Sequence, residues 1–288
     1  MKVPFPSPKE LLSKHGLFAK KSWGQNFLIS ERVYRAIVDA SVAESGDWVV
    51  EFGAGLGTLT MRLAERVPEG KVFCVERDRE LVAVLEAELG HLENVEVVPG
   101  NALTYDLKTV ARAQGEPICV CGNLPYQIAS RILVNTIDCG VDVVSKAVFM
   151  VQREVADRLL ASPGTKQYGL LSVIVQTVAV VEKVVQAPPG AFLPPPKVSS
   201  TVVRLRLLPA EKREEIVDFS GHRAVVKAAF SQRRKRLSNS LTSAFSKTAI
   251  VASLAEAGID GARRAETLTV KEFARLSNSF SRLERDGA

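Results

Sequence analysis

Apolar and polar residues alternate in two different ways between residues 30 and 207. Short runs rich in β-branched residues are separated by stretches in which apolar residues recur every three or four positions. The short runs predict seven strands, over residues 47–53, 71–76, 95–100, 117–123, 146–152, 181–186 and 200–207. The other stretches predict helices over residues 31–42, 58–66, 78–89, 129–137, 153–161 and 168–178. Strands alternating with helices are typical of a doubly wound α/β domain with a mostly parallel sheet.

The pattern changes after Leu208, where a Pro-Ala pair is followed by polar, helix-forming sequence without a strand-like run. We therefore expect a basic N-terminal segment (1–22), an α/β domain (23–208) and a small all-helical C-terminal domain (209–288). In the last of these, apolar residues recur at spacings of four and seven, as a buried helix face requires. They are Val226, Phe230, Leu237, Leu241 and Phe245.

The first strand runs into a glycine-rich turn that contains Gly53 and Gly55 and precedes a helix. Such a turn lets the backbone approach a ligand at the carboxyl end of a parallel strand. The spacing is GxGxG, and Thr58 stands where a dinucleotide fingerprint has its third glycine, which gives less reason to expect a pyrophosphate site. Glu76 ends the second strand, where a carboxylate could accept both hydroxyls of a ribose. The pattern suits a nicotinamide cofactor or S-adenosylmethionine, and a plain structural turn is the alternative.

The fourth strand ends in Asn123-Leu124-Pro125-Tyr126, which suits alkylation of the N6 amine of adenine. The N6 lone pair is delocalised into the ring, so an enzyme must hold the amine with acceptors. The Asn123 side-chain oxygen and the Leu124 carbonyl can accept its two N–H bonds, and Pro125 stiffens the turn. Tyr126 offers a face on which an extruded base can stack. The alternative is a turn that merely starts a helix.

Charge is unevenly distributed within the net +6. Residues 1–25 hold five Lys and one Glu, and residues 209–288 hold 15 basic and 10 acidic residues, whereas residues 26–208 hold 18 basic and 21 acidic ones. Basic ends around an acidic middle favour an enzyme body with polyanion-binding attachments, although a solvated surface gives the same pattern. Four consecutive cations on a predicted helix could contact RNA phosphates, and Lys197 could extend that surface. They are Arg233, Arg234, Lys235 and Arg236.

The remaining composition disfavours several classes of protein. No apolar run is long enough to cross a membrane, and the first residues lack the apolar segment of a secretory signal. The four cysteines form no CxxC pair, which predicts reduced core thiols in a cytoplasmic protein. The three histidines are too scattered to suggest a metal site, and we expect a monomer. The cysteines are Cys74, Cys119, Cys121 and Cys139.

Four motifs, which follow one another along the sequence, resemble those of a known family. They are KSWGQNFL at residues 21–28, the GxGxG turn, the tetrapeptide at 123–126 and FLPPPKV at 192–198. Together they resemble the ribosomal RNA adenine N6,N6-dimethyltransferases, specifically the KsgA/RsmA branch that acts on 16S rRNA. The resemblance implies a Rossmann-like class I methyltransferase fold and S-adenosylmethionine as methyl donor. It also implies dimethylation of two adjacent adenosines near the 3′ end of 16S rRNA in a small-subunit precursor.

The resemblance also implies roles for individual residues. Asn26 and Leu28 should line the cofactor pocket, and Asn123 should serve both cofactor and target. Gly53 should lie at the methionine portion of the cofactor and Glu76 at its ribose.

The resemblance also implies roles for Phe192 and Asn101, and for each of them a purely structural role is the alternative. Phe192 should face the target base opposite Tyr126, unless it anchors the proline-rich loop in the core. Asn101 follows the third strand, at a position where the family usually has Asp. Its uncharged side chain should contact the adenine of the cofactor, and a plain turn residue is the alternative.

Four other functions remain possible. A 23S rRNA adenine N6-methyltransferase of the macrolide-resistance type would use the same pocket. A DNA N6-adenine methyltransferase usually has Pro in place of Leu124, and a nicotinamide oxidoreductase is disfavoured by the glycine spacing. A non-catalytic, rRNA-binding assembly factor is the alternative from another class.

Overall fold

The computed structural model describes residues 5–20 and 23–286. The chain divides into two compact units, an α/β unit (1–156 and 181–207) and a helical unit (157–180 and 208–288). Residues 157–180 therefore pack with the C-terminal part of the chain, although they lie inside the α/β sequence. The domain limits expected at residues 22 and 208 stay predictions.

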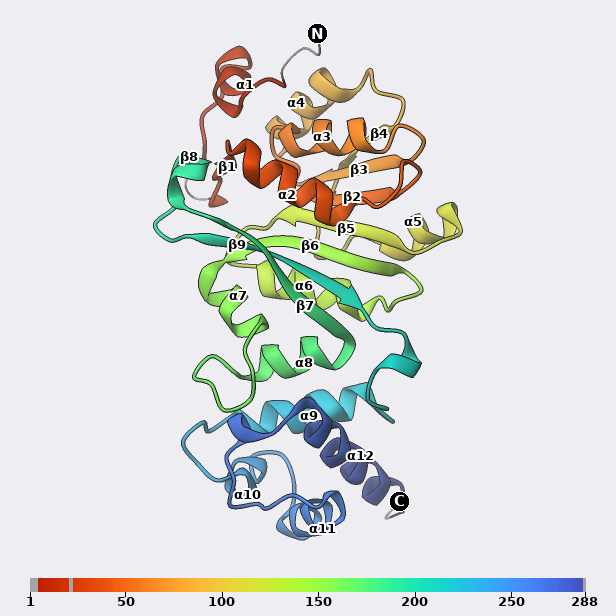
Figure 1. Ribbon diagram of the computed structural model, residues 1–288, viewed down its shortest axis with the longest axis vertical. Coiled ribbons are helices and arrows are strands. Elements are labelled where there is room, and N and C mark those ends of the chain that lie inside the picture. The colour runs from red at the N-terminus through yellow and green to blue at the C-terminus, as the bar shows by residue number, and fades with distance from the viewer. Residues whose placement is uncertain (1–4, 21–22, 287–288) are drawn as a thin grey trace. The chain divides into compact units, whose positions relative to one another are not determined.

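The α/β unit is built on a seven-stranded sheet, as expected (Figure 1). Its strands are β2 (Trp48–Phe52), β3 (Lys71–Glu76), β4 (Val95–Pro99), β5 (Ile118–Asn123), β6 (Val144–Gln152), β7 (Ala179–Ala187) and β9 (Ser200–Leu207). Their order is β4-β3-β2-β5-β6-β9-β7. The pairs from β4 to β6 are parallel, whereas β6 and β9 are antiparallel. The order reverses between β2 and β5, which is where ligands bind in open α/β sheets.

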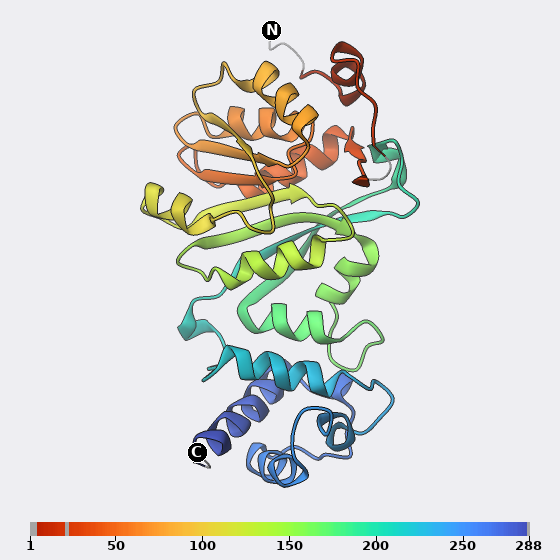
Figure 2. The same ribbon diagram turned by 180° about the vertical axis from the view of Figure 1, so that it is seen from behind.

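Helices cover both faces of this sheet. They are α2 (Glu31–Ser41), α3 (Thr58–Arg66), α4 (Arg79–Leu89), α5 (Leu107–Gln114) and α6 (Ala129–Asp138), and α7 (Arg153–Leu159) runs from this unit into the helical one. Helix α2 lies in front of the sheet in Figure 1, and α6 faces the viewer in Figure 2, which shows the opposite side. The arrangement confirms the doubly wound class I methyltransferase fold expected from the sequence.

An N-terminal helix and a short second ladder were not expected. Helix α1 (Pro8–Lys14) begins with a capping box between Ser7 and Glu10. Its buried Leu11 packs in a cluster with residues of the glycine-rich turn and of α4. Strand β1 (Phe27–Leu28) pairs antiparallel with β8 (Phe192–Leu193), which follows a 3₁₀ turn (Pro189–Ala191). Helix α1 and strand β1 are therefore held against the rest of the α/β unit.

Glu51, in the middle of β2, is a carboxyl group buried in the core of the α/β unit. Its side chain is 2% exposed and accepts a hydrogen bond from the Thr60 hydroxyl at 2.6 Å. Burial raises the pKa of Glu51 from 4.5 to about 8. The folded chain therefore keeps a proton between these pH values that the unfolded chain loses.

We expect this proton to make stability fall as the pH rises from 4.5 to 8. Glu51→Gln keeps an oxygen for Thr60 and removes the charge, so its free energy of unfolding relative to wild type should rise over this interval. Since one unit of pKa is worth about 1.4 kcal/mol, we expect a relative gain of more than about 1 kcal/mol between pH 5 and pH 8. Urea denaturation at several pH values measures it, with the exposed Glu86→Gln as control. A difference that does not change with pH would contradict the assignment.

The helical unit contains α8 (Leu170–Val178), α9 (Phe219–Ala229), α10 (Leu237–Leu241), α11 (Lys247–Ala257) and α12 (Val270–Asp286), with 3₁₀ turns at Ala210–Lys212 and Ala265–Thr267. Buried His222 on α9 contacts Thr177 of α8 at 3.2 Å and Ser277 of α12 at 2.8 Å. Burial lowers its pKa to about 4, so the ring is neutral near pH 7. These contacts tie residues 157–180 to the C-terminal helices.

The apolar residues expected on one helix face lie on two helices. Val226, Leu237 and Leu241 are buried in the cluster of the helical unit, with Phe230 and Phe245 packed against it. The chain turns between α9 and α10, because the backbone N–H groups of Leu237 and Ser238 bond to the carbonyls of Arg263 and Gly261. The burial expected from the spacing is confirmed, but the single helix is wrong.

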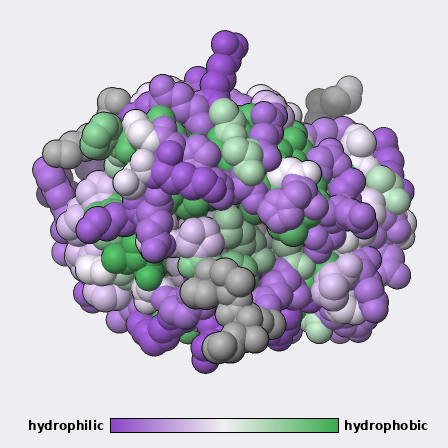
Figure 3. Space-filling view, turned by 90° about the horizontal axis from the view of Figure 1, so that it is seen from above, coloured by the Kyte–Doolittle hydropathy of each residue, from purple (hydrophilic) through white to green (hydrophobic). Residues whose placement is uncertain are grey.

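None of the helices in the described ranges combines the length and the apolar character that a membrane crossing requires. All four cysteines are free thiols. On the face shown in Figure 3, hydrophobic residues lie in small groups among hydrophilic ones.

Candidate active site

The glycine-rich turn lies where the strand order reverses. Gly53, Gly55 and Gly57 have φ values of 72°, 60° and 75°, a region that L side chains rarely adopt. A Cβ atom at Gly53 would lie 3.6 Å from the Asn123 backbone oxygen at the end of β5. The turn after β2 and the end of β5 therefore lie next to each other, as the expected cofactor site requires.

Glu76 holds the glycine-rich turn by its carboxylate. It is 9% exposed, and one oxygen accepts the backbone N–H of Gly55 at 2.9 Å. The other oxygen accepts the N–H groups of Arg77 at 2.7 Å and Asp78 at 2.8 Å. Since a carboxylate oxygen accepts about two hydrogen bonds, the oxygen next to Gly55 keeps one position for a ligand hydroxyl. The structure thus favours one ribose contact through this oxygen over the two expected.

Asn101 forms a local turn after β4. Its side-chain oxygen accepts the Leu103 N–H at 3.0 Å, and its carbonyl accepts the Thr104 N–H at 2.9 Å. This is an Asx turn, the alternative considered from the sequence. A role at the cofactor adenine would use the second lone pair of the side-chain oxygen or the amide N–H groups, and it stays a prediction.

The tetrapeptide after β5 presents acceptors as expected. The Asn123 amide nitrogen donates to the Asn26 carbonyl at 3.0 Å, which fixes the side chain and leaves its oxygen as an acceptor. Leu124 is buried, and its N–H donates to Met150 at 3.2 Å. No residue that the structure describes bonds to the Asn123 side-chain oxygen or the Leu124 carbonyl. Two acceptors from adjacent residues are therefore available to one amine.

Tyr126 is half-buried and fixed at its hydroxyl. This group lies 2.9 Å from the hydroxyl of Ser200, the first residue of β9. Burial raises the pKa of Tyr126, so the phenol stays neutral at physiological pH. The ring is held in place, while its partial exposure leaves surface on which a base could stack.

The segment before β1 forms a wall at this site. Asn26 accepts the bond from Asn123 and donates its own amide to the Gly24 carbonyl at 2.9 Å. Leu28 is buried in the core, and its carbonyl accepts the Tyr34 hydroxyl. Asn26 therefore contacts the tetrapeptide directly, whereas a Leu28 contact to the cofactor stays a prediction. Lys21 and Ser22 of the same motif lie outside the described residues.

Sequence reasoning missed the residues that hold this segment. Lys20 donates to both carboxylate oxygens of Asp78, at 3.0 and 2.8 Å, and Gln25 donates to the same carboxylate at 2.9 Å. Burial opposes ionisation of Asp78, but the bonds from Lys20 and its neighbours keep its pKa below the usual value. Asp78 also caps α4 through the Glu80 N–H. The position of Asp78 just after Glu76, at a helix start, is the signal that could have identified it.

Phe192, expected to face the target base opposite Tyr126, is buried in the structure. Its side chain is 2% exposed and belongs to the core cluster around α2, with Leu28 opposite it in the β1–β8 ladder. No ring contact joins it to Tyr126 within the described ranges. Pairing with β1 turns the side chain inward, which favours the core anchor that the sequence left as the alternative, and a contact with the target base stays a prediction.

We expect Phe192→Leu to keep most of the methyl-transfer rate and to lower the free energy of unfolding by about 1 kcal/mol, as volume-reducing apolar changes in a core do. A residue that stacks on the target base would show the opposite pattern, since base stacking is worth about 1 to 3 kcal/mol. Parallel measurement of urea unfolding and of single-turnover transfer separates the two. Normal stability with a large loss of rate would restore the stacking role.

The predicted RNA-binding cations do not lie on a helix. Residues 231–236 form the turn between α9 and α10, and all are exposed. Arg233 pairs with Glu266 at 3.0 Å and donates to the carbonyls of Lys166 and Tyr168. The guanidinium of Arg233 is thus already bonded within the helical unit. Lys197, in the α/β unit, is exposed.

Comparisons with known proteins agree with this geometry. The model of the ribosomal RNA adenine dimethylase family matches residues 16–282. Three relatives carry the name ribosomal RNA small subunit methyltransferase A. The protein of Anaeromyxobacter sp. (strain K) is 43% identical, covering 96% of this chain and 98% of its own. The protein of Myxococcus xanthus is 44% identical, and the match covers 96% of this chain and 96% of its own. The protein of Desulfitobacterium hafniense is 46% identical, and the match covers 92% of this chain and 94% of its own.

Two solved structures share the fold over most of the chain. A dimethyladenosine transferase from Plasmodium falciparum has a TM-score of 0.74 at 24% identity, with 89% of this chain and 98% of its own covered. The 23S rRNA methyltransferase ErmE has a TM-score of 0.65 at 25% identity, with 89% and 100% covered.

Proposed function

The chain belongs to the ribosomal RNA adenine dimethylase family, and on that basis we propose that it dimethylates N6 of adenosines in 16S rRNA. The three relatives described above, named for the small subunit, are 43–46% identical over more than 90% of the chain. The 23S rRNA methyltransferase ErmE is 25% identical, which makes a large-subunit target the less favoured alternative. The target that fits best is the pair of adjacent adenosines near the 3′ end, modified in a small-subunit precursor.

The residues present fit S-adenosylmethionine as methyl donor. The glycine-rich turn is a cradle in which a side chain at Gly53 would be strained and would approach the Asn123 carbonyl. Glu76 keeps one acceptor position for a ribose hydroxyl, and Asn123, which bonds to Asn26, lies next to the turn at Gly53. When bound there, S-adenosylmethionine would supply an electrophilic methyl group.

The two acceptors of the tetrapeptide carry the proposed mechanism. The Asn123 side-chain oxygen and the Leu124 carbonyl accept the two N6 hydrogens and turn the nitrogen lone pair toward the methyl group. The bond from the Asn123 amide nitrogen to Asn26 ensures that the oxygen, not the nitrogen, faces the target. Rate enhancement then comes from position, which can supply about 7 to 11 kcal/mol of a barrier. No general base is needed, because the alkylated amine is acidic enough to lose its proton to water.

Tyr126 holds the target base by stacking. Its hydroxyl bond to Ser200 fixes the ring relative to the sheet, and Pro125 stiffens the turn that carries it. Phe192 contributes through β8, which fixes β1 and so the wall that contains Asn26. We therefore assign stacking on the base to Tyr126 and support of the site to Phe192.

Methyl transfer to isolated ribosomal subunits tests the proposal. Unmethylated small and large subunits are incubated with labelled S-adenosylmethionine, and the nucleosides are separated by mass spectrometry. Dimethyladenosine in the small subunit alone is the expected result. Label in the large subunit alone would favour the resistance-type activity. Cofactor binding without label anywhere would favour an assembly factor that has lost its chemistry. A monomeric state and a cytoplasmic location stay predictions.

A further inference from the structure

The wall beside Asn123 is held at two points. It consists of residues 23–26, and the carbonyl of its last residue, Asn26, accepts the bond that orients the Asn123 side chain. One residue earlier, the Gln25 amide donates to the carboxylate of Asp78 at 2.9 Å. The proposed mechanism uses the first of these contacts and gives the second no role.

Lys20 strengthens the contact between the wall and Asp78. Its ammonium donates to both oxygens of the Asp78 carboxylate, at 3.0 and 2.8 Å. Its backbone N–H donates to the Gln25 side-chain oxygen at 2.8 Å, and its carbonyl accepts the Trp23 N–H at 3.0 Å. Lys20 therefore binds Asp78 through its side chain and the wall through its main chain. We call Lys20, Gln25 and Asp78 the clamp.

Asp78 is a fixed anchor for the clamp. Its side chain is 4% exposed, so salt screens its pairing with Lys20 less than that of a surface pair. The carboxylate also accepts the Glu80 N–H at 3.2 Å, which caps α4. The Asp78 N–H donates to Glu76 at 2.8 Å, and Glu76 accepts the Gly55 N–H. The clamp thus ties the wall to the carboxylate proposed for the cofactor ribose.

The position of the wall decides which atom of Asn123 faces the target. The Asn123 amide nitrogen donates to a main-chain carbonyl of the wall, at Asn26. When the wall moves, this carbonyl moves with it, and the amide is free to turn its nitrogen toward the target in place of its oxygen. A displacement of about 1 Å near reacting groups can cost on the order of a hundredfold in rate. A contact that fixes the wall therefore bears on the chemical step.

We propose that Asp78 is a positioning residue for methyl transfer, because it fixes the wall through Lys20 and Gln25, and the wall fixes the Asn123 acceptor. This inference rests on the proposed function for the role of Asn123. It also separates Lys20 from the other cations of the N-terminal segment. Lys20 then serves the rate of transfer, whereas a polyanion-binding lysine would serve RNA affinity.

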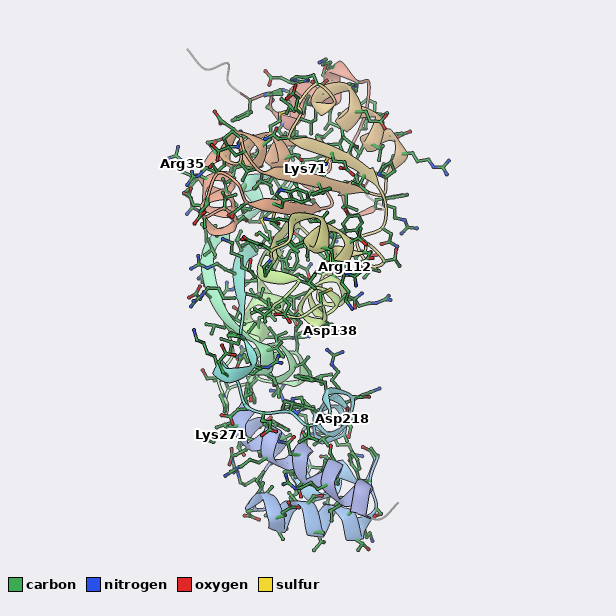
Figure 4. The ribbon with its side chains drawn as sticks, turned by 90° about the vertical axis from the view of Figure 1, so that its right-hand side faces the viewer. Arg35, Lys71, Arg112, Asp138, Asp218 and Lys271 are labelled. Carbon is green, nitrogen blue, oxygen red and sulfur yellow. The ribbon has the colours of Figure 1, made fainter. Side chains whose placement is uncertain are left out.

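Two variants open the clamp. Asp78→Ser removes the acceptor for Lys20 and keeps the cap of α4, since serine caps helices about as well as aspartate. Lys20→Met keeps the apolar stem and removes the ammonium. The control is Lys71→Met (Lys71 is labelled in Figure 4). Lys71 pairs with Glu96 at 2.7 Å, and its side chain is 32% exposed against 33% for Lys20. Lys71 begins β3, whereas the cofactor carboxylate lies at the other end of that strand.

Single-turnover transfer to small subunits is measured with saturating S-adenosylmethionine, and thermal unfolding checks that each variant is folded at the assay temperature. We expect each clamp variant to lose roughly ten- to a hundredfold in rate, as a displaced acceptor does. Subunit affinity should stay within about threefold of wild type. Lys71→Met should transfer at the wild-type rate. Unchanged rates in both clamp variants would overturn the proposal, as would weaker subunit binding at an unchanged rate in Lys20→Met.

Combination with Asn123→Ala separates positioning from a general loss of stability. If the clamp acts through Asn123, adding Asp78→Ser to Asn123→Ala should slow transfer by less than about threefold further, because the acceptor that the clamp places is already gone. A merely structural role would slow both backgrounds by the same factor. Losses that multiply in this way would overturn the proposal.

The fluorescence of Trp23 gives a readout that does not depend on methyl transfer. Trp23 is 49% exposed, and the Lys20 ammonium lies 5.6 Å from the centre of its ring. Trp48 is the other tryptophan of the chain, so the measurement is made in Trp48→Phe. Asp78→Ser should increase quenching of Trp23 by acrylamide, because the wall is no longer held. Unchanged quenching would show that the wall keeps its place without Asp78 and would overturn the proposal.

The two readouts together distinguish this inference from the proposed function. If wild type transferred no methyl group to either subunit while Asp78→Ser still increased quenching, the proposed function would fail and Asp78 would stand as the anchor of the wall. If wild type methylated small subunits and Asp78→Ser did so at the same rate, the proposed function would stand and the positioning role would fail.

Discussion

Asn123→Ala should lower the rate of methyl transfer by on the order of a thousandfold, the upper end of what loss of one preorganised hydrogen bond costs. The side-chain oxygen is one of two acceptors proposed for the N6 amine, and alanine leaves only the Leu124 carbonyl. With one acceptor the amine can rotate, and its lone pair loses alignment with the methyl group. Single-turnover transfer to small subunits measures the rate without interference from product release.

Binding measurements decide whether this loss comes from chemistry. Subunit affinity should stay within about threefold of wild type, because the phosphate contacts that dominate affinity are elsewhere. The matched control is Asn26→Ala, which removes a neighbouring amide side chain and keeps the carbonyl that Asn123 contacts. A similar loss of rate in the control would mean that the position of the wall, and not the Asn123 acceptor, limits transfer. Equal loss of rate and RNA affinity in Asn123→Ala would contradict its assigned role.

Glu76→Ala should weaken S-adenosylmethionine binding by on the order of a hundred- to a thousandfold. One part of the loss is the proposed ribose contact, since a hydrogen bond to a charged group is worth about 1.5 to 3 kcal/mol. The other part is the glycine-rich turn, because the Gly55 N–H loses its acceptor. The variant should also unfold more easily, by about 1 to 3 kcal/mol, as three backbone N–H groups lose their partner.

Calorimetric titration of cofactor into the variant gives the affinity. The control for loss of charge is Glu86→Ala, because Glu86 is exposed and lies on α4, the helix that follows Glu76. An affinity close to wild type would show that Glu76 serves only the turn. An equal loss of affinity in both variants would mean that removal of a negative charge, and not loss of the Glu76 hydrogen bonds, weakens cofactor binding.

The sheet could be predicted from the sequence because its signals are local. The central parallel strands β2, β3 and β5 are short, largely apolar runs buried at every position but one, as burial on both faces of a parallel sheet predicts. The first helix, α1, was missed although Ser7, Pro8 and Glu10 form a readable capping box. Helix α5 was likewise missed between an Asp106 cap and Gly115. In both cases the caps carried more information than the weak apolar pattern.

What could not be predicted depends on partners far away in the chain. Phe192 is buried because β8 pairs with β1, and two-residue strands give no periodic signal. Arg233 is engaged because Glu266 and the loop at 166–168 meet it in space. In the cofactor site, the types of residue at Gly53, Glu76 and Asn123 could be predicted from the ends of strands. The bond that orients Asn123 depends on a backbone carbonyl, which has no signature in the sequence.

The pairing of β1 with β8 links the order of synthesis to the onset of activity. Chains grow from the N-terminus, and their domains fold as units as they emerge from the ribosome. The wall around Asn26 emerges early, yet Ile29 donates to Ala191 and Phe27 lies opposite Leu193. A nascent chain shorter than this point has the glycine-rich turn and the tetrapeptide but cannot form the ladder beside the wall. Growing chains in which residue 193 has not yet left the ribosome therefore lack this support for Asn26, so that translation itself sets the earliest moment at which the site is complete.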